Sequence, residues 1–185
     1  MTSTCDSIRA GFAERLRQPG IIVAPGVYDA LSALLAEQAG FEAVFFSGAA
    51  MATAHLGMTD VGLMSMTEIA TIVQRAADRV SIPIVVDIDQ GYGGAPHAAR
   101  AMRSFERAGA AAVQVEDQQV VKPQRDLTSR PLVPVGEMQD KIKAMLDARE
   151  SVDMLLSART DATDAQEAID RCCAYREAGA DLVFP

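Results

Sequence analysis

The sequence predicts a parallel α/β protein that forms part of an eight-stranded (β/α) barrel, and three observations point to this fold. The spacing of apolar residues alternates between the 3.6-residue period of a helix and short continuous runs typical of buried strands. A helix–Ala-Gly–strand junction occurs three times, beginning at Ala39, Ala108 and Ala178. Charged residues stand where the predicted strands end, and in a barrel those ends meet at one mouth. In the alternative, an open doubly wound sheet, they would be spread along an edge.

Six helices are expected from the periodic segments. Three of them are followed by a glycine suited to a left-handed C-terminal cap, at Gly40, Gly109 and Gly179. Two begin with capping-box spacing, at Ser65 and Thr163. The predicted helices are 7–18, 29–39, 65–80, 96–108, 135–149 and 163–179.

Six strands are expected between these helices, at 21–24, 43–46, 82–87, 112–116, 154–158 and 181–184. We therefore interpret residues 1–185 as one domain with six βα units. A complete barrel needs at least about 200 residues and usually about 250, so we expect a barrel truncated at its C-terminus. Such a piece would have open edges and would expose barrel-facing side chains, which we expect to be those of Val44, Val85, Val113 and Leu155.

Composition narrows the possible functions. The formal net charge is −8 and no Lys/Arg cluster stands out, which disfavours binding to nucleic acid or to an anionic membrane. No apolar stretch approaches the roughly 20 residues needed to span a bilayer, and the first residues do not resemble a secretory signal. The three cysteines have no disulfide or metal-ligand spacing, so we expect a cytoplasmic protein.

Carboxylates at two neighbouring strand ends predict a metal site. Asp87 and Asp89 follow the third strand, and Glu116 ends the fourth. An isolated Asp-x-Asp is more often part of a turn or a helix cap. Here Asp87 ends a buried run, where an unpaired carboxylate is costly, and a glycine-rich loop follows instead of a helix. Mg²⁺ is typically held by one or two carboxylates together with waters and substrate oxygens, and two or three carboxylates are expected to converge here.

Two further features have both functional and structural interpretations. The small residues 47–50 follow the second strand, where their N–H groups could bind an anion or simply form a tight turn. Arg159 ends the fifth strand and needs an anionic partner. That partner is either a substrate carboxylate or a structural one, Glu116 or Asp161.

Five segments in order resemble the isocitrate lyase / phosphoenolpyruvate mutase superfamily. They are PGVYDA at 25–30, SGA at 47–49, DIDQGYG at 87–93, VEDQ at 115–118 and ARTD at 158–161. The resemblance is to the branch that holds 2-methylisocitrate lyase and carboxyphosphonoenolpyruvate phosphonomutase, and it runs from about residue 25 to residue 185.

The resemblance implies a homotetrameric enzyme that acts on a small carboxylic acid through an enolate-like species. By that resemblance, Mg²⁺ is held by Asp87, Asp89 and Glu116. The substrate is bound by Ser47, Gly48, Ala49, Asp60 and Arg159, and Tyr28 lies nearby as a catalytic candidate together with Arg159.

The loop after the fourth strand departs from the lyase pattern. Lyases of this family carry Lys-(Lys/Arg)-Cys-Gly-His there, whereas residues 122–126 read KPQRD. Lys122 is kept, but Gln124 stands in the place of the proton-donating cysteine and Asp126 in that of the histidine. An amide has no usable proton for this role, so we expect little cleavage of methylisocitrate. We also expect the long polar loop 118–131 to form a mobile lid.

We interpret the protein as a Mg²⁺-dependent lyase of short α-oxy or α-keto acids, cleaving a carbon–carbon bond or removing carboxylate. Lys122 and Gln124 complete its catalytic candidates. Phosphorus–carbon bond chemistry is the first alternative. A non-catalytic paralogue that binds an acid is the second.

Overall fold

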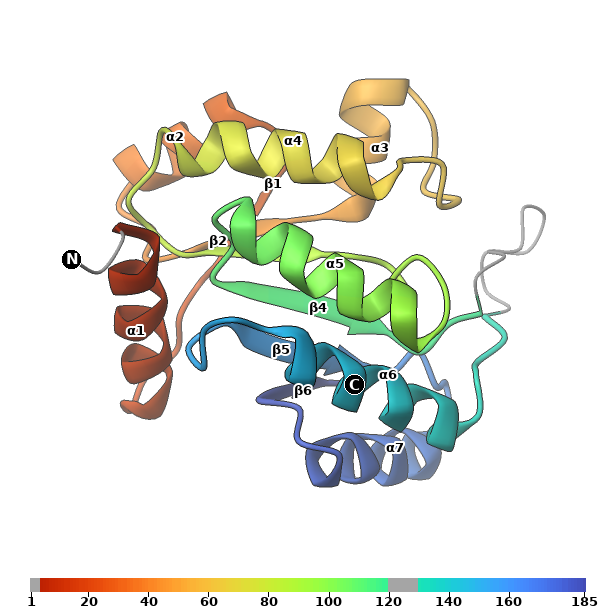
Figure 1. Ribbon diagram of the computed structural model, residues 1–185. Helices are drawn as coiled ribbons and strands as arrows, with labels where there is room; N and C mark the ends of the chain where they lie inside the picture. Colours follow the sequence, from red (N-terminus) through yellow and green to blue (C-terminus); the bar gives the residue numbers. More distant parts are fainter. Residues whose placement is uncertain (1–3, 120–129) are drawn as a thin grey trace.

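The computed structural model describes residues 4–119 and 130–185, in which six parallel strands form one sheet in the order of the sequence. The strands are β1 (Gly26–Val27), β2 (Val44–Phe46), β3 (Ile84–Asp87), β4 (Ala112–Glu116), β5 (Leu155–Arg159) and β6 (Leu182–Phe184). Sequential parallel order with a helix between neighbouring strands is the arrangement of a (β/α) barrel, here a partial one (Figure 1). The predicted fold class is confirmed.

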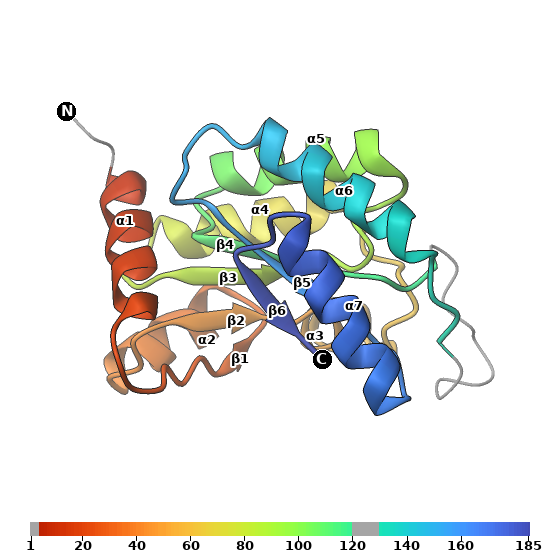
Figure 2. The same ribbon diagram turned by 90° about the horizontal axis from the view of Figure 1, so that it is seen from below.

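Seven helices are present in the described residues, one more than the sequence predicted. They are α1 (Thr4–Arg17), α2 (Ala30–Gln38), α3 (Gly48–Leu56), α4 (Met66–Ala77), α5 (Ala95–Arg107), α6 (Val135–Ala148) and α7 (Ala165–Glu177). In Figures 1 and 2, α4, α5 and α6 lie along the outside of the sheet, while α1 lies across the end at which the strands begin.

Side-chain oxygens begin several of these helices by capping the first turn. Ser65 and Glu68 form the predicted capping box of α4. The cap of α7 is Asp164, which accepts a hydrogen bond from the N–H of Glu167, so the predicted start at Thr163 was one residue early. Asp29 caps α2 in a capping box with Ser32.

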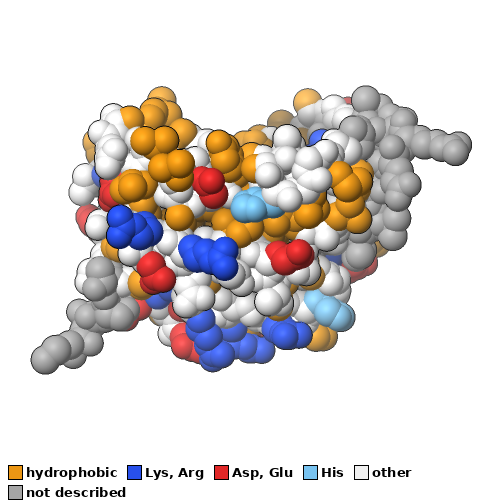
Figure 3. Space-filling view, turned by 90° about the horizontal axis from the view of Figure 1, so that it is seen from above, with side chains coloured by type: hydrophobic (Ala, Val, Ile, Leu, Met, Phe, Trp, Pro, Cys, Tyr) orange, Lys and Arg blue, Asp and Glu red, His pale blue; other side chains and the backbone are white. Residues whose placement is uncertain are grey.

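The outer surface carries both charged and apolar side chains. Figure 3, which looks from above onto the side with α2, α3 and α4, shows an apolar band between charged groups. Leu31 and Leu35, one turn apart on α2, are 62% and 55% exposed. In residues 4–119 and 130–185, no helix has the length and apolar character required to cross a bilayer.

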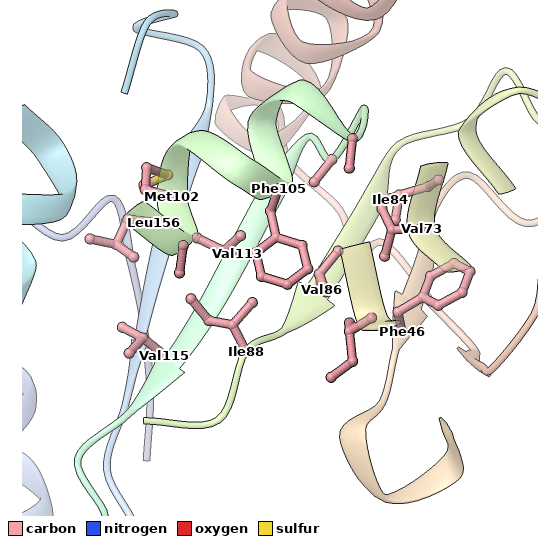
Figure 4. Close-up of a cluster of buried hydrophobic side chains, with 14 of the residues drawn as sticks. Phe46, Val73, Ile84, Val86, Ile88, Met102, Phe105, Val113, Val115 and Leu156 are labelled. Carbon is pink, nitrogen blue, oxygen red and sulfur yellow. The ribbon is translucent and has the colours of Figure 1, made fainter. Parts of the chain in front are cut away.

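The main core lies between the sheet and its outer helices. Strand side chains such as Val86, Val113 and Leu156 pack there against Met102 and Phe105 of α5 (Figure 4). Because successive side chains of a strand point to opposite faces, the alternate residues face the barrel interior.

A second, smaller apolar cluster fills the interior at the end where the strands begin. It contains Ala112 and Leu155, with Val85 packed against it, and is covered by Phe12 and Ala13 of α1. Two parts of the sequence expectation were therefore wrong. Val44 and Val113 belong to the outer core and do not face the interior. The interior side chains are also not laid open, because α1 covers them and Leu155 is only 7% exposed.

The first strand was also misplaced. The apolar run at residues 21–24 is not a strand, and Ile21 and Val23 are 85% and 60% exposed. Pairing with β2 begins only at Pro25, whose carbonyl accepts the N–H of Phe45, and continues with Gly26 opposite Phe45. Register with β2, and not hydrophobicity, determines where β1 lies.

If α1 closes the interior, truncating the Phe12 side chain of α1 should lower the stability of the fold. Phe12 is 6% exposed, so we expect Phe12→Ala to lower the free energy of unfolding of the full-length protein by about 3 kcal/mol. The measurement is urea-induced unfolding followed by circular dichroism. The control is Phe41→Ala, which truncates a 37% exposed ring and should cost much less. Equal losses in the two variants would contradict the packing of α1 on the sheet.

Candidate active site

Charged groups from several elements line one cavity at the ends where the strands finish. The cavity has a volume of about 600 Å³. Its charged lining residues come from several elements, namely Asp60, Asp87, Glu116, Arg130 and Arg159. Its uncharged lining includes Ser47, Gln114 and the rings of Phe45 and Phe184. The predicted meeting of strand-end residues at one mouth is found.

Asp87, the last residue of β3, points at the beginning of α3. Its Oδ2 accepts a hydrogen bond from the N–H of Gly48 at 3.3 Å, and its Oδ1 accepts one from the N–H of Asp89 at 3.1 Å. The carboxylate is buried, so these donors and the positive end of α3 replace part of its lost hydration.

The segment after β3 joins this strand to β4 at the mouth. The N–H of Glu116 donates to the carbonyl of Asp89 at 2.9 Å, and Asp89 has a positive φ of 49°. The side chain of Asp89 is buried but is not part of the cavity lining. Asp89 therefore contributes to the site through its backbone contacts.

Asp60, predicted as a substrate-binding residue, lines the cavity and also lies close to Asp87. A Cβ atom at Gly48 would lie 3.3 Å from Asp87 Oδ2 and 3.7 Å from Asp60 Oδ2. Gly48 thus separates two carboxylates, and the absence of a side chain there lets both approach α3. Asp60 joins the carboxylates that could hold a metal ion.

Arg159 contacts carboxylates on two sides. Its Nη2 and Nε donate to Asp161 Oδ1 at 2.6 and 3.1 Å, and its Nη1 lies 3.7 Å from Glu116 Oε2. The ring of Phe184 lies 5.6 Å from Cζ. Burial alone would lower the pKa of Arg159, but the charges of Asp161 and Glu116 raise it above its ordinary value. Both structural partners left open by the sequence are present.

The donor set fits Mg²⁺ better than a soft metal. Among the described residues, no three His, Cys, Asp or Glu side chains converge tightly enough to hold an ion by themselves. Mg²⁺ usually binds one or two carboxylates and keeps several waters. Asp87 and Glu116 face one cavity with room for water, and all nearby donors are hard oxygens. The residues present therefore fit a hydrated Mg²⁺ ion.

Other predicted site residues lie differently from expectation. Ser47 is the N-cap of α3, so residues 48–50 form the first turn of a helix and not a loop. Tyr28 does not line the cavity, is 41% exposed, and its carbonyl lies 3.0 Å from His55 Nε2. Lys122 and Gln124, with most of the predicted lid, lie outside the described residues.

Sequence reasoning missed a buried network centred on Asp117, which has no exposed surface. Its Oδ2 accepts hydrogen bonds from Thr160 Oγ1 at 2.7 Å, Tyr175 OH at 2.6 Å and Arg171 Nη1 at 3.2 Å. Its Oδ1 accepts the N–H of Asp161 at 3.1 Å. The adjacent acidic pair Glu116-Asp117 was the available signal, because neighbouring strand residues must point in opposite directions.

Gln114 was missed as well. It lines the cavity two residues before Glu116, in the middle of an apolar strand. A polar residue at that spacing from a site residue lies on the same face of the strand. By the same rule, Ser157 lies on the same face of β5 as Arg159.

Comparisons with known proteins show which family this chain resembles. The family model described as phosphoenolpyruvate phosphomutase matches residues 12–185. The 2,3-dimethylmalate lyase of Eubacterium barkeri is 39% identical over 178 residues, covering 95% of this chain and 62% of that protein. The 2-methylisocitrate lyase of Bacillus subtilis (strain 168) is 44% identical over 190 residues, covering 99% of this chain and 61% of that protein.

A solved structure extends the likeness to three dimensions. Phosphonopyruvate hydrolase in complex with oxalate and Mg²⁺ superposes with a TM-score of 0.84 at 33% identity, covering 98% of this chain and 62% of that chain. This chain thus spans about three fifths of the length of the proteins it matches.

The pairing of Arg159 with Asp161 predicts a specific dependence on pH. Burial raises the pKa of Asp161, but the hydrogen bond from Gln118 and the charge of Arg159 lower it by more, so the pKa lies below its ordinary value. A carboxyl with a depressed folded-state pKa stabilises the fold above its unfolded-state pKa of about 3.9 and loses that effect as pH falls through the folded-state value.

We therefore expect Asp161→Asn to lower the free energy of unfolding at pH 7. The difference from wild type should stay constant between about pH 8 and 5 and shrink in more acidic buffers. Urea unfolding at a series of pH values measures it, with Asp147→Asn on the exposed side of α6 as the control. A difference that persists unchanged into acid would contradict the ion pair.

Proposed function

This chain belongs to the isocitrate lyase / phosphoenolpyruvate mutase superfamily, and from that premise we propose that the whole protein is a Mg²⁺-dependent carbon–carbon lyase of short α-oxy or α-keto acids. The observation that carries the proposal is the meeting of the Asp87 and Glu116 carboxylates with the guanidinium of Arg159 in one cavity. The lyase names of 2,3-dimethylmalate lyase and 2-methylisocitrate lyase, both relatives of this chain, support it.

Asp87 and Glu116 would hold Mg²⁺, with Asp60 and Asp89 contributing through water. Bound there, the ion would stabilise the negative charge that develops on substrate oxygens during cleavage. The Mg²⁺ and oxalate named for phosphonopyruvate hydrolase support this choice of metal.

Arg159 would bind the acid. Its guanidinium stays protonated at any physiological pH and matches the geometry of a carboxylate, while Asp161 and Glu116 hold it in place. Ser47 and the N–H of Ala49, in the first turn of α3, would orient a second oxygen of the substrate. The N–H of Gly48 is already occupied by Asp87 and would act by holding that ligand.

Cleavage of a 2-hydroxy acid breaks the bond between carbons 2 and 3. The hydroxyl proton leaves to a base, a keto acid is released, and the bonding electrons remain as an enolate that must gain a proton. Lys122, Gln124 and Tyr28 remain our catalytic candidates around this step. Because Gln124 cannot supply the proton, we propose that solvent does.

Phosphorus–carbon bond chemistry is the second candidate function. It is favoured by the match to the phosphoenolpyruvate phosphomutase model over residues 12–185. The same cavity, metal ligands and arginine would serve a phosphonate in place of a second carboxylate.

The biological setting is also proposed. We propose a cytoplasmic homo-oligomer, a tetramer by family resemblance. The apolar band of Figure 3, with Leu31 and Leu35 of α2 exposed, supports contact with further protein.

The function is tested with the full-length protein freed of divalent ions. 2,3-Dimethylmalate, 2-methylisocitrate, oxaloacetate and phosphonopyruvate are incubated with and without Mg²⁺ and followed by NMR. We expect cleavage of at least one carboxylic acid only with Mg²⁺, little turnover of 2-methylisocitrate, and a loss of kcat of about a hundredfold or more in Asp87→Asn and Glu116→Gln. Asp147→Asn is the matched control. Turnover of phosphonopyruvate alone would favour the second candidate, and ligand binding without any turnover would contradict both.

The glycine between the two carboxylates offers a separate test of the metal site. A Cβ at Gly48 would press on Asp87 Oδ2 at 3.3 Å, while the helical backbone there tolerates alanine. We expect Gly48→Ala to remain folded and to weaken Mg²⁺ binding by about tenfold, measured by calorimetric titration. Gly136→Ala, also in the first turn of a helix but with open space around it, should bind Mg²⁺ as wild type does. Equal Mg²⁺ affinities of the two variants would show that Gly48 does not adjoin the metal site.

A further inference from the structure

The interior face of β4 carries a polar side chain below the charged mouth. Gln114 lies between Ala112, which belongs to the closed apolar end, and Glu116, which lines the mouth. In the strand register it is opposite Asp87 on β3 and Ser157 on β5. Gln114 therefore forms part of the cavity floor, one row deeper than Glu116 and Arg159.

Within residues 4–119 and 130–185, the side-chain amide of Gln114 forms no hydrogen bond, and the residue is 7% exposed. The neighbouring Gln118 differs, because its amide donates to Asp161 Oδ2. The amide is not fully enclosed, because Gln114 lines the cavity and its polar atoms are open to that space. The amide faces the cavity, so its partner must come from what the cavity holds.

The charges around the cavity show which kind of group this partner is. The carboxylates of Asp87 and Glu116 stand beside and above the floor, and the guanidinium of Arg159 is in the row above and already contacts two carboxylates. In the strand register, the row of Gln114 carries the neutral side chain of Ser157 on one side and Asp87 on the other, and the ring of Phe45 lines the cavity one row below. A neutral amide donates and accepts hydrogen bonds, so it recognises a polar group without requiring a charge.

We propose that Gln114 is a specificity-determining residue that hydrogen-bonds a polar group at the deep end of the substrate. It favours acids that carry nitrogen or oxygen at that position over acids that carry a methyl group. This inference rests on the proposed function, because it assumes that a small acid occupies the cavity. A site built to form a hydrogen bond discriminates strongly against a ligand that lacks the partner, since its own polar group is then left unpaired.

Oxamate and pyruvate test this directly because they have the same size and share a carboxylate and a carbonyl. They differ only in an amino group against a methyl group. Both are titrated calorimetrically into the full-length protein with saturating Mg²⁺. We expect wild type to bind oxamate more tightly than pyruvate. Gln114→Met keeps the length of the side chain but not its hydrogen bonds, and should weaken oxamate binding by about tenfold and pyruvate binding by less than about twofold.

Three controls separate a loss of the Gln114 hydrogen bond from misfolding and from a loss of Mg²⁺ binding. Gln166→Met, on the exposed side of α7, should leave both affinities unchanged. Retained pyruvate binding shows that Gln114→Met is folded, and an unchanged Mg²⁺ affinity separates the floor from the metal site. Ser157→Ala, beside Gln114, should reduce the preference for oxamate in the same direction.

The possible failures are distinguishable. If wild type binds neither acid with Mg²⁺ present, the proposed function fails and this inference with it. If wild type binds both acids and Gln114→Met weakens them equally or not at all, the role of Gln114 is overturned while the proposed function stands.

Discussion

The site depends on one geometric constraint, the two-residue side-chain period of strands held in parallel register. Because Asp87 lies opposite Gln114, and Glu116 opposite Arg159, every second side chain of neighbouring strands enters the interior at a matching height. The interior is thereby divided into an apolar end under α1, a middle row with Asp87, Gln114 and Ser157, and a row with Glu116 and Arg159 at the mouth. A shift of one residue in any strand would exchange the core side chains of that strand for its site side chains.

The alternation of side chains also buries a charged residue, Asp117, behind the site. Asp117 follows Glu116 and must point away from the cavity, where its charge needs compensation. Arg171 and Tyr175 of α7 and Thr160 after β5 provide it. One buried carboxylate therefore joins β4, β5 and α7 directly behind Glu116 and Arg159. Similarly, Lys141 of α6 donates to the carbonyl of Gln90 at 3.4 Å, so that helices support the loop that follows β3.

Local patterns were enough to predict most of the framework and part of the site. The capping box of α4 and the strand-end positions of Asp87, Glu116 and Arg159 follow from short-range sequence features. The helix α3 was missed because its residues are almost all small or apolar and show no polar face, although Ser47 and Gly57 carry cap signals. The place of β1, the inward or outward direction of each strand, and the pairing of Gln118 with Asp161 depend on tertiary register, which no local window contains.

The distribution of charge across the cavity constrains how an acid can lie in it. Carboxylates come from β3, from β4 and from Asp60 after α3, and Arg159 of β5 lies beside the carboxylates of Glu116 and Asp161. Arg159 is fixed before any ligand arrives, because Asp161 and Glu116 already engage part of its five-donor guanidinium. Under the proposed function, a substrate carboxylate would meet a rigid partner and lose little binding energy to ordering it. Under the proposed function, an acid held at Arg159 with its oxygens directed toward Asp87 and Glu116 would bring its remaining part near the floor at Gln114.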